Sequence, residues 1–306
     1  MPTTTVDGVL VIDKPQGLTS HDVVAAARRA LGEKRVGHTG TLDPLATGVL
    51  PLAIGRATRL VRFLSASDKD YDATIRFGLT TDSYDATGVE TARTDRVPAC
   101  DALVAAIGEL TGDYLQSPPA FSAKKTEGRR AYTLARLGQT VALPSVPVRV
   151  SRASLLDLTG DTARVALTCS AGFYVRSFAH ALGEITGTGA CLDALRRTRS
   201  GEFGLDVAIS MGHLGRTAGL DGDLVALERL LTSFPSVTLT DRGRVHVTHG
   251  REVHPEDFVA SPEDPAGGGG GGTDAWVRLL DGTGTLVAMA TSGQAPGSLH
   301  PSVVLV

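Results

Sequence analysis

The stretch VALTCSAGFYVRSFAHALGEI, residues Val165–Ile185, carries two different hydrophobic periods one after the other. Val165, Leu167 and Cys169 alternate with other residues, which predicts a half-buried β-strand. From Val175 onward the apolar residues recur at helical spacing, which predicts an amphipathic helix directly after the strand. The order strand, short turn, helix is the local unit from which the fold class can be argued.

The same two periods recur elsewhere and define the other expected elements. Further strands are predicted at Val9–Ile12 and Tyr71–Phe77, and further helices at Ser20–Leu31, Asp101–Thr111 and Leu224–Leu231. Ser20 is expected to cap the first helix and Gly32 to end it. Because strands and helices do not alternate as regular β-α-β units, the sequence predicts an α+β fold with a mainly antiparallel central sheet.

The chain changes character near Ser233–Ser236, after which short strand-like runs dominate. Trp276–Leu280 and Thr285–Ala290 flank a turn, Asp281-Gly282-Thr283-Gly284, which predicts a hairpin. Residues 261–273 include six consecutive glycines and are expected to form a flexible loop. We therefore expect two domains, residues 1–232 and a small β-rich domain over residues 233–306.

Composition narrows the class of protein. With 306 residues, 42% hydrophobic and 21% charged, the chain has the composition of a soluble globular protein. The sequence contains no run of eighteen apolar residues, so it predicts no membrane span. Met1–Gly8 does not resemble a secretory signal, so the expected location is the cytoplasm. Cys100, Cys169 and Cys191 are too few and too far apart for a disulfide framework or a zinc site, and Cys169 is expected to be a small buried residue.

The charge is unevenly distributed along the chain. Its net value is −3, and acidic residues dominate between Asp68 and Asp113. The cations gather in four groups: Arg28, Arg29, Lys34 and Arg35; Arg56, Arg59 and Arg62; Lys124, Lys125, Arg129, Arg130 and Arg136; Arg196, Arg197 and Arg199. Each group alone is interpretable as solvated surface. Together they suggest a track for nucleic-acid phosphates, with the acidic region around Asp82 to Glu90 facing away from it.

Several enzyme signatures are missing from the sequence. There is no GxxxxGK[ST] loop, no HExxH and no GxSxG. His246, His249 and His254 lie close together, but no acidic or thiol partner completes a ligand set, so we expect no metal site. The expected chemistry is therefore carried by ordinary side chains.

The segment RVGHTGTLDPLATGVL, residues Arg35–Leu50, is the most informative loop. Its three glycines, and Pro44 directly after Asp43, predict an irregular backbone that can approach a ligand closely. From the residues alone, a turn-forming or capping aspartate is the simpler interpretation of Asp43. The residues of the loop alone therefore do not predict a function.

The loop closely resembles the catalytic loop of the bacterial pseudouridine synthases that modify uridine at tRNA position 55, the TruB family. Four further segments resemble that family in the same order: Val9–Val24 with its KPxGxTS pattern, Ser67–Gly88, Ser117–Arg136, and Cys169–Glu184 with its Tyr-x-Arg pattern. Gly189–Arg197, ending in LRR, closes the set, and the resemblance covers roughly residues 8 to 205. It implies a catalytic domain with a central antiparallel sheet, followed by a small RNA-binding domain of the PUA kind.

The implied activity is the isomerisation of uridine to pseudouridine in the T-arm of tRNA, without metal or other cofactor. The resemblance makes Asp43 the nucleophile, Arg176 the cation that holds it, and Tyr71 the residue that stacks on the target base and helps to remove the C5 proton. Without the family pattern, Arg176 is interpretable as a surface arginine and Tyr71 as a core aromatic residue of a strand.

Other residues are expected to shape the substrate site. The resemblance implies that Tyr174 and Leu195 line the uridine pocket, although alone each would be taken for ordinary core. His38 matches the residue that fills the space left by the flipped base, and its alternative is a structural loop histidine. Lys14 and Pro15 are expected to brace the catalytic loop. Four basic residues are candidates for RNA backbone contacts: Lys124, Lys125, Arg129 and Arg130.

Three other functions stay open from the sequence. The first is a tRNA-binding or tRNA-folding chaperone whose activity does not need Asp43, Tyr71 and Arg176 together. The second is a glycoside-type hydrolase, which normally needs two carboxylates, whereas the Arg35–Leu50 loop offers one. The third is a related synthase with another RNA target. We expect a monomer without an obligate protein partner.

Overall fold

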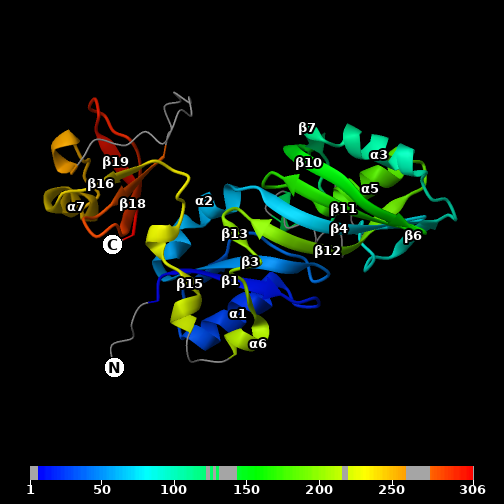
Figure 1. Ribbon diagram of the computed structural model, residues 1–306, viewed down its shortest axis with the longest axis horizontal. Helices are drawn as coiled ribbons and strands as arrows, with labels where there is room; N and C mark the ends of the chain where they lie inside the picture. Colours follow the sequence, from blue (N-terminus) through cyan, green and yellow to red (C-terminus); the bar gives the residue numbers. More distant parts are fainter. Residues whose placement is uncertain are drawn as a thin grey trace.

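A large twisted sheet forms the body of the protein, and a smaller sheet lies at one end (Figure 1). The computed structural model describes residues 6–121, 125–126, 129–130, 143–215, 220–259 and 276–305, with backbone alone at 125–126, 129–130 and 220–221. The predicted flexible loop over residues 261–273 and the candidate Lys124 lie outside the described residues.

The elements follow one another without a regular β-α-β rhythm. The strands are β1 Gly8–Lys14, β2 Val36–His38, β3 Thr47–Ile54, β4 Lys69–Phe77, β5 Leu79–Thr81, β6 Glu90–Arg93, β7 Gly112–Gln116, β8 Lys125–Thr126, β9 Arg129–Arg130, β10 Val146–Thr159, β11 Thr162–Cys169, β12 Ala190–Ser200, β13 Phe203–Gly204, β14 Ile209–Ser210, β15 Leu224–Val225, β16 Ser236–Thr238, β17 Val277–Leu280, β18 Leu286–Ser292 and β19 Leu299–Val304. The α-helices are α1 Ser20–Leu31, α2 Val61–Ala66, α3 Cys100–Glu109, α5 Val175–Ile185, α6 Met211–Leu214 and α7 Asp241–Thr248, and the 3₁₀ turns are η1 Gly55–Leu60, η2 Leu220–Asp223, η3 Leu227–Arg229 and η4 Pro255–Asp257.

The large sheet is mainly antiparallel, as predicted. Its strand order is β14-β1-β3-β12-β4-β11-β10-β7, with β2 paired to β3, β13 to β12 and β15 to β1. The parallel pairs in this sheet are β1 with β14 and β3 with β12. The pairing of β3 with β12 matters for the site, because it brings the end of the Arg35–Leu50 loop beside the LRR segment.

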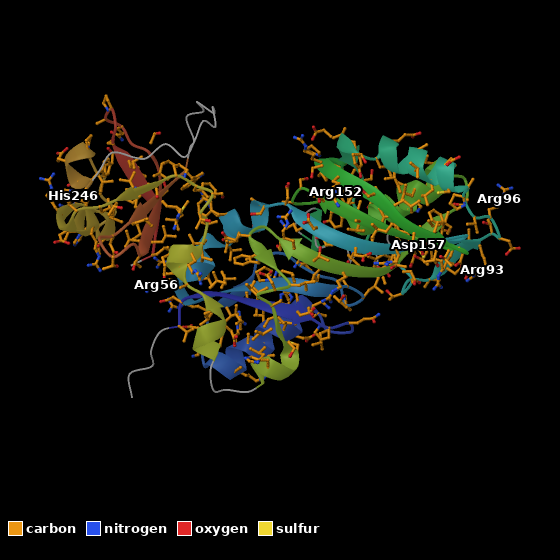
Figure 2. All side chains as sticks on the ribbon, viewed as in Figure 1. Arg56, Arg93, Arg96, Arg152, Asp157 and His246 are labelled. Atoms are coloured by element: carbon orange, nitrogen blue, oxygen red, sulfur yellow. The ribbon has the colours of Figure 1, made fainter. Side chains whose placement is uncertain are left out.

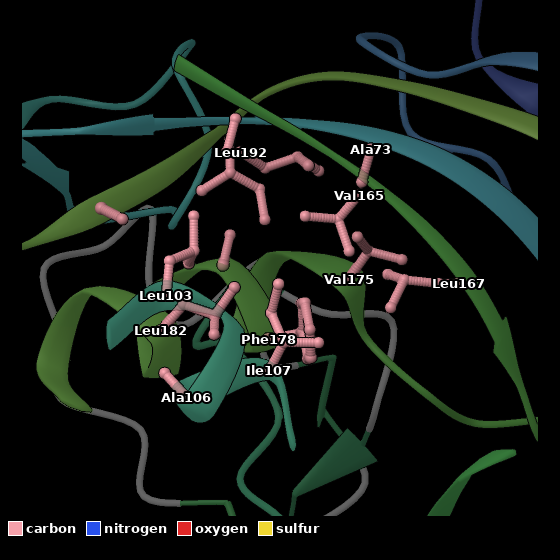
Figure 3. Close-up of a cluster of buried hydrophobic side chains, with 14 of the residues drawn as sticks. Ala73, Leu103, Ala106, Ile107, Val165, Leu167, Val175, Phe178, Leu182 and Leu192 are labelled. Atoms are coloured by element: carbon pink, nitrogen blue, oxygen red, sulfur yellow. The ribbon is translucent and has the colours of Figure 1, made fainter. Parts of the chain in front are cut away.

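Two groups of helices cover one face of the large sheet. Helices α3 and α5 pack on β4, β11 and β12 through Phe178, Leu182 and Ile107, as Figure 3 shows. Helices α1 and α6 pack on β1 and β3 in a second cluster. Tyr71 and Leu195 contact both clusters, so the two residues lie at the seam between them.

Helix α1 has the predicted bounds, but a different residue caps it. Thr19 is the N-cap: its side chain accepts a hydrogen bond from the Asp22 amide, and the Asp22 carboxylate accepts one from the Thr19 amide. Gly32 ends the helix in the left-handed conformation, as predicted. Ser20 was the wrong cap because its hydroxyl is buried and bonded to the backbone of Leu42.

The helix predicted at Leu224–Leu231 is wrong. Leu224 and Val225 form β15, which pairs antiparallel with Leu10 and Val9 of β1, and a short 3₁₀ turn follows. The apolar spacing over eight residues fits both structures. Pairing with a buried strand decided between them, since it satisfies the backbone polar groups that a helix would otherwise satisfy internally.

The C-terminal sheet has the order β16-β17-β18-β19, and the predicted hairpin joins β17 to β18. It shares a hydrophobic core with the large sheet, where Leu286 and Met289 pack with Val9 and Val49. The second basic group of the sequence also attaches the described part of the C-terminal segment to the rest of the protein.

That second basic group serves the junction of the two sheets. Arg56 lies where they meet (Figure 2), donates to the Leu305 carbonyl at 3.0 Å and pairs with Asp7. Arg59 donates to the Val304 carbonyl, and the Arg62 guanidinium lies 4.3 Å from the centre of the Trp276 ring. These contacts argue against a place for this group in a phosphate track.

Candidate active site

The loop of residues 39–46, between β2 and β3, presents Asp43 and is tied to its surroundings by backbone hydrogen bonds. The Ser20 hydroxyl donates to the Leu42 carbonyl at 3.0 Å and accepts from the Leu42 amide at 2.9 Å. The Gly17 amide donates to the Pro44 carbonyl at 2.8 Å. The N-terminal KPxGxTS segment therefore acts as a rigid support for the loop on which Asp43 lies.

Lys14 supports the segment that holds the loop. Its ammonium group is buried and donates to the carbonyls of Pro15 and Leu18 at 2.9 and 2.8 Å, which fixes the turn that carries Gly17. Burial lowers the pKa of Lys14, while the nearby Asp43 carboxylate acts in the opposite direction. These contacts fit the expected bracing role of Lys14 and Pro15.

Arg197 also holds the loop in place. Its side chain is almost fully buried, with 1% of the residue exposed, and it donates to the Val49 carbonyl at 2.7 Å and the Gly40 carbonyl at 3.1 Å. Gly48 has a φ of +99°, and a Cβ there would lie 2.1 Å from the Arg197 carbonyl oxygen. Only glycine allows β3 to approach β12 this closely. The sequence placed Arg197 in a phosphate track, whereas the structure makes it internal.

Replacement of Arg197 by Met is expected to destabilise the fold by roughly 2–5 kcal/mol, because two buried carbonyls lose their donor. Urea unfolding measures this change. Arg196→Met is the matched control, since Arg196 is 41% exposed and its partner Asp13 is 36% exposed. An exposed pair of this kind contributes about 1 kcal/mol or less. Equal effects of the two substitutions would contradict the bracing role of Arg197.

Asp43 opens into a cavity of about 200 Å³ at the seam between the two helix groups. Ten residues line it: Thr41, Leu42, Asp43, Tyr71, Phe121, Phe173, Tyr174, Val175, Arg176 and Leu195. The structure therefore brings Asp43, Tyr71, Tyr174, Arg176 and Leu195 to one cavity, although they are distributed over more than 150 positions of the sequence.

Arg176 is the central cation of this cavity. It lies in the first turn of α5, its side chain is 9% exposed, and its Nη2 is 3.0 Å from Oδ2 of Asp43, which is 43% exposed. The same guanidinium donates to the carbonyls of Phe121 and Ser83 at 3.0 and 3.2 Å. Its Nη1 also lies 3.5 Å from Oδ2 of Asp85. One arginine is thus shared between two carboxylates.

Asp85 is a site residue that the sequence interpretation missed. Its side chain is 7% exposed, although it belongs to the acidic segment that was expected to face away from the groove. That expectation is wrong for Asp85, because Thr81, Ser83 and Thr87 hydrogen-bond around it and turn its Oδ2 toward Arg176. The signal was present, since Asp85 lies within the Ser67–Gly88 segment that resembles the family.

Tyr71 and Tyr174 are held in different ways. Burial raises the pKa of Tyr71, and the nearby Arg197 guanidinium acts in the opposite direction, so the phenol is neutral at physiological pH. A neutral phenol can stack and exchange hydrogen bonds, but it is a weak base. Tyr174 is fixed by Gln116, whose amide oxygen accepts from the Tyr174 amide at 2.8 Å and whose amide nitrogen donates to the Tyr174 carbonyl at 3.1 Å.

His38 lies at the end of β2 and is not among the residues that line the cavity. Burial lowers the pKa of His38, and its ring lies edge-on to that of His21 at 5.6 Å. Lys125, Arg129 and Arg130 lie in the β8–β9 hairpin, whose side chains are outside the described set, as is Lys124 entirely. No side-chain contact is therefore described for these four basic residues, and their role in RNA binding stays a prediction.

The fourth basic group is fully used within the protein. Arg196 forms a two-pronged pair with Asp13 at 3.1 and 2.9 Å, and Arg199 pairs with Asp70 at 2.6 and 2.9 Å. With Arg197 buried, these contacts do not support a phosphate track along the LRR segment. Charge alone did not reveal that each of these arginines has an internal partner.

The described residues offer little for an alternative chemistry. No group of three or more His, Cys, Asp or Glu side chains is arranged to hold a metal ion there. A larger cavity of about 940 Å³ lies beside β19, but its twelve lining residues carry no ionisable side chain. In the same residues, no helix has the length and apolarity needed to cross a lipid bilayer. The cavity at Asp43 is therefore the candidate active site.

Comparisons with known proteins identify the family of the chain. Residues 28–175 match the family described as TruB family pseudouridylate synthase (N terminal domain). The chain is 45% identical to tRNA pseudouridine synthase B of Solibacter usitatus, over 98% of this chain and 100% of that one. It is 37% identical to tRNA pseudouridine synthase B of Pseudomonas aeruginosa, over 93% of this chain and 91% of that one.

A solved structure shares the fold. A chain from the crystal structure of a Cbf5–Nop10–Gar1 complex superimposes with a TM-score of 0.75, at 24% identity, over 98% of this chain and 85% of that chain. At this identity the likeness concerns the fold alone. Since the identity to the relatives is high along nearly the whole chain, the protein belongs to the TruB family of pseudouridylate synthases and is a pseudouridine synthase.

Proposed function

We propose that the protein converts the uridine at position 55 in the T-arm of tRNA to pseudouridine, with Asp43 as the nucleophile. The observation that carries the proposal is the placement of a half-exposed Asp43 carboxylate in a small cavity, 3.0 Å from the buried Arg176 guanidinium. The tRNA substrate is supported by the names of the relatives, which are tRNA pseudouridine synthases.

The reaction rearranges the substrate without adding atoms or electrons. The C1′–N1 bond of uridine breaks, the base rotates, C1′ bonds to C5, the C5 proton leaves and N1 takes up a proton. A carboxylate suits this sequence because it can form a covalent bond to the substrate and later leave. No redox group is required by this balance, so we propose that the protein acts without a cofactor.

The residues around Asp43 hold and shape the substrate. Arg176 orients the carboxylate by a charge-assisted contact. Tyr71 stacks on the uracil ring, and its hydroxyl helps to remove the C5 proton. Tyr174 and Leu195 form the walls of the uridine pocket.

The remaining predicted residues act on the RNA outside the cavity. The target base is flipped out of its stack, which costs roughly a few kcal/mol. We propose that His38 fills the vacated space and that Lys124, Lys125, Arg129 and Arg130 contact RNA phosphates. The proposal assigns catalysis to residues 1–232 and further RNA contact to a PUA-like domain over 233–306, in a cytoplasmic monomer.

A tRNA transcript tritiated at C5 of its uridines tests the proposal. The C5 proton is lost when the new C–C bond forms, so released tritium counts turnovers. We expect about one tritium per tRNA from the wild-type protein and none from a transcript that carries cytidine at position 55. Release that persists from the cytidine transcript would contradict the choice of position 55.

Product analysis separates the proposal from a hydrolase. The structure adds Asp85 beside Asp43, so two carboxylates do meet one arginine. However, Asp85 is buried, is bonded within its own loop and does not line the cavity, which leaves it unsuited to activate water at the substrate. A hydrolase would release free uracil, whereas the proposed reaction releases none. Tight tRNA binding without tritium release would instead favour the chaperone.

A further inference from the structure

Arg176 depends for its position on the short segment Ser83–Asp85, between β5 and β6. Its Nη1 donates to the Ser83 carbonyl at 3.2 Å and lies 3.5 Å from the Asp85 carboxylate. Asp85 is fixed within its own loop, because the amide and hydroxyl of Thr87 donate to its Oδ1 at 3.0 and 2.6 Å. The Ser83–Asp85 segment therefore holds the Nη1 side of the guanidinium, whose Nη2 contacts Asp43.

Tyr84, between these two residues, has a strained backbone. Its φ is +64°, and Leu231 is the only other non-glycine residue with a positive φ among those described. A side chain with a Cβ disfavours this left-handed region. Such strain persists only where the surroundings impose it, and it gathers at functional sites. The hydrogen bond from the Leu192 amide to the Tyr84 carbonyl, at 3.0 Å, is one such constraint.

The Tyr84 ring provides a second constraint, because it stacks on the imidazole of His180. The ring centres are 3.9 Å apart and the planes differ by 5°. His180 follows Arg176 by four residues on α5, so both side chains leave the same face of the helix. The Nδ1 atom of His180 is buried and has no hydrogen-bond partner in the part of the chain that the structure describes. We infer that His180 contributes its flat ring at this position, and not the hydrogen-bonding capacity of its Nδ1.

We propose that Tyr84 and His180 are positioning residues for the reaction, because their stack ties the Ser83–Asp85 segment to α5 and keeps Arg176 directed at Asp43. The inference rests on the proposed function, in which the Arg176–Asp43 pair serves the chemistry. Neither Tyr84 nor His180 lines the cavity, so the stack acts through Arg176 and not on the substrate.

Tyr84→Gly is the sharpest test of this proposal. Glycine accepts a φ of +64° without strain, so the substitution removes the ring while relieving the backbone. We expect the single-turnover rate of tritium release to fall about tenfold or more, since small displacements of catalytic groups have effects of this size. The Kd for tRNA should stay within about twofold, since Tyr84 does not line the cavity. A purely structural role would lower stability and leave the single-turnover rate of folded protein intact.

His180 gives the complementary variants. His180→Ala should lower the single-turnover rate as Tyr84→Gly does, while His180→Phe and Tyr84→Phe retain stacked rings and should lose far less. His213→Ala is the matched control, because His213 is a half-exposed histidine paired with Asp223 away from the cavity. If Tyr84→Gly and His180→Ala both kept the wild-type rate while Asp43→Asn was inactive in the same assay, the positioning role of the stack would be overturned. The proposed function would be unaffected by that result.

If the wild-type protein releases no tritium, the proposed function is refuted. A second measurement then still tests the positioning role of the Tyr84–His180 stack. Rotation of the Arg176 guanidinium about its Nε–Cζ bond can be followed by ¹⁵N NMR in the free protein. Faster rotation in Tyr84→Gly than in the wild type supports the positioning role of the stack. Equal rotation in the two proteins overturns it.

Discussion

Replacing Asp43 by Asn is expected to abolish tritium release from tRNA, with a fall in single-turnover rate of roughly 10³-fold or more. The amide keeps the shape of the side chain, but it cannot form and release a covalent bond to the substrate as a carboxylate does. Arg176 retains its contacts to Asp85, Ser83 and Phe121, so the pocket itself should persist. Tritium release and tRNA affinity, measured on the same preparations, check both parts of the prediction.

Asp13→Asn is the matched control for Asp43→Asn. Asp13 is 36% exposed and pairs with Arg196 at 2.9 Å, which is close to the exposure and pairing of Asp43, but it does not line the cavity. Both substitutions should change the free energy of unfolding by less than about 1 kcal/mol. If Asp43→Asn turned over within about tenfold of the wild type, the nucleophile would have to be another group.

Replacing Arg176 by Met should reduce the rate by roughly 10²–10³-fold, the size seen when a fixed charge partner is removed from an active site. The Kd for tRNA should change far less, because Arg176 is nearly buried and acts on Asp43. Stability should also fall, by about 3 kcal/mol, since the buried Asp85 carboxylate loses its cation. Single-turnover kinetics, tRNA titration and urea unfolding measure the three effects.

The double variant Arg176→Met/Asp85→Asn separates stability from catalysis. It removes the unpaired buried charge, so much of the lost stability should return, while the rate should stay low because Asp43 still lacks its partner. Arg164→Met, which breaks a half-exposed pair with Asp72, is the control and should cost less than about 1 kcal/mol. Normal turnover at saturating tRNA, combined with weak affinity, would show that Arg176 binds RNA instead of orienting Asp43.

Much of the fold was predictable from the sequence because it depends on local periods. The alternation from Tyr71 to Phe77 became β4, and the change of period within Val165–Ile185 became β11 followed by α5. These segments are long enough for their hydrophobic period to be unambiguous. At Leu224–Leu231 the segment was short, and pairing with β1 replaced the predicted helix by a strand and a 3₁₀ turn.

The charged residues behaved differently, because their roles depend on which strands become neighbours. Arg56 meets the C-terminal end of the chain, Arg197 crosses to the Gly40 carbonyl, and Arg199 meets Asp70. No local pattern distinguishes an arginine with such a partner from one that faces solvent or RNA. The expectation of a phosphate track therefore failed for two of its four groups.

By itself, the sequence determined the α+β class, the main strands and helices, and, through its motifs, the family and the identity of Asp43, Tyr71 and Arg176 as candidates. Those properties follow from local hydrophobic period and from residues close together in the chain. Only the tertiary structure decided that Arg176 is divided between Asp43 and Asp85, that Arg197 braces the loop, and that Tyr84 stacks on His180. The physical reason is that hydrogen bonds, ion pairs and ring contacts act over a few ångströms in space, and chain folding alone determines which distant residues come within that range.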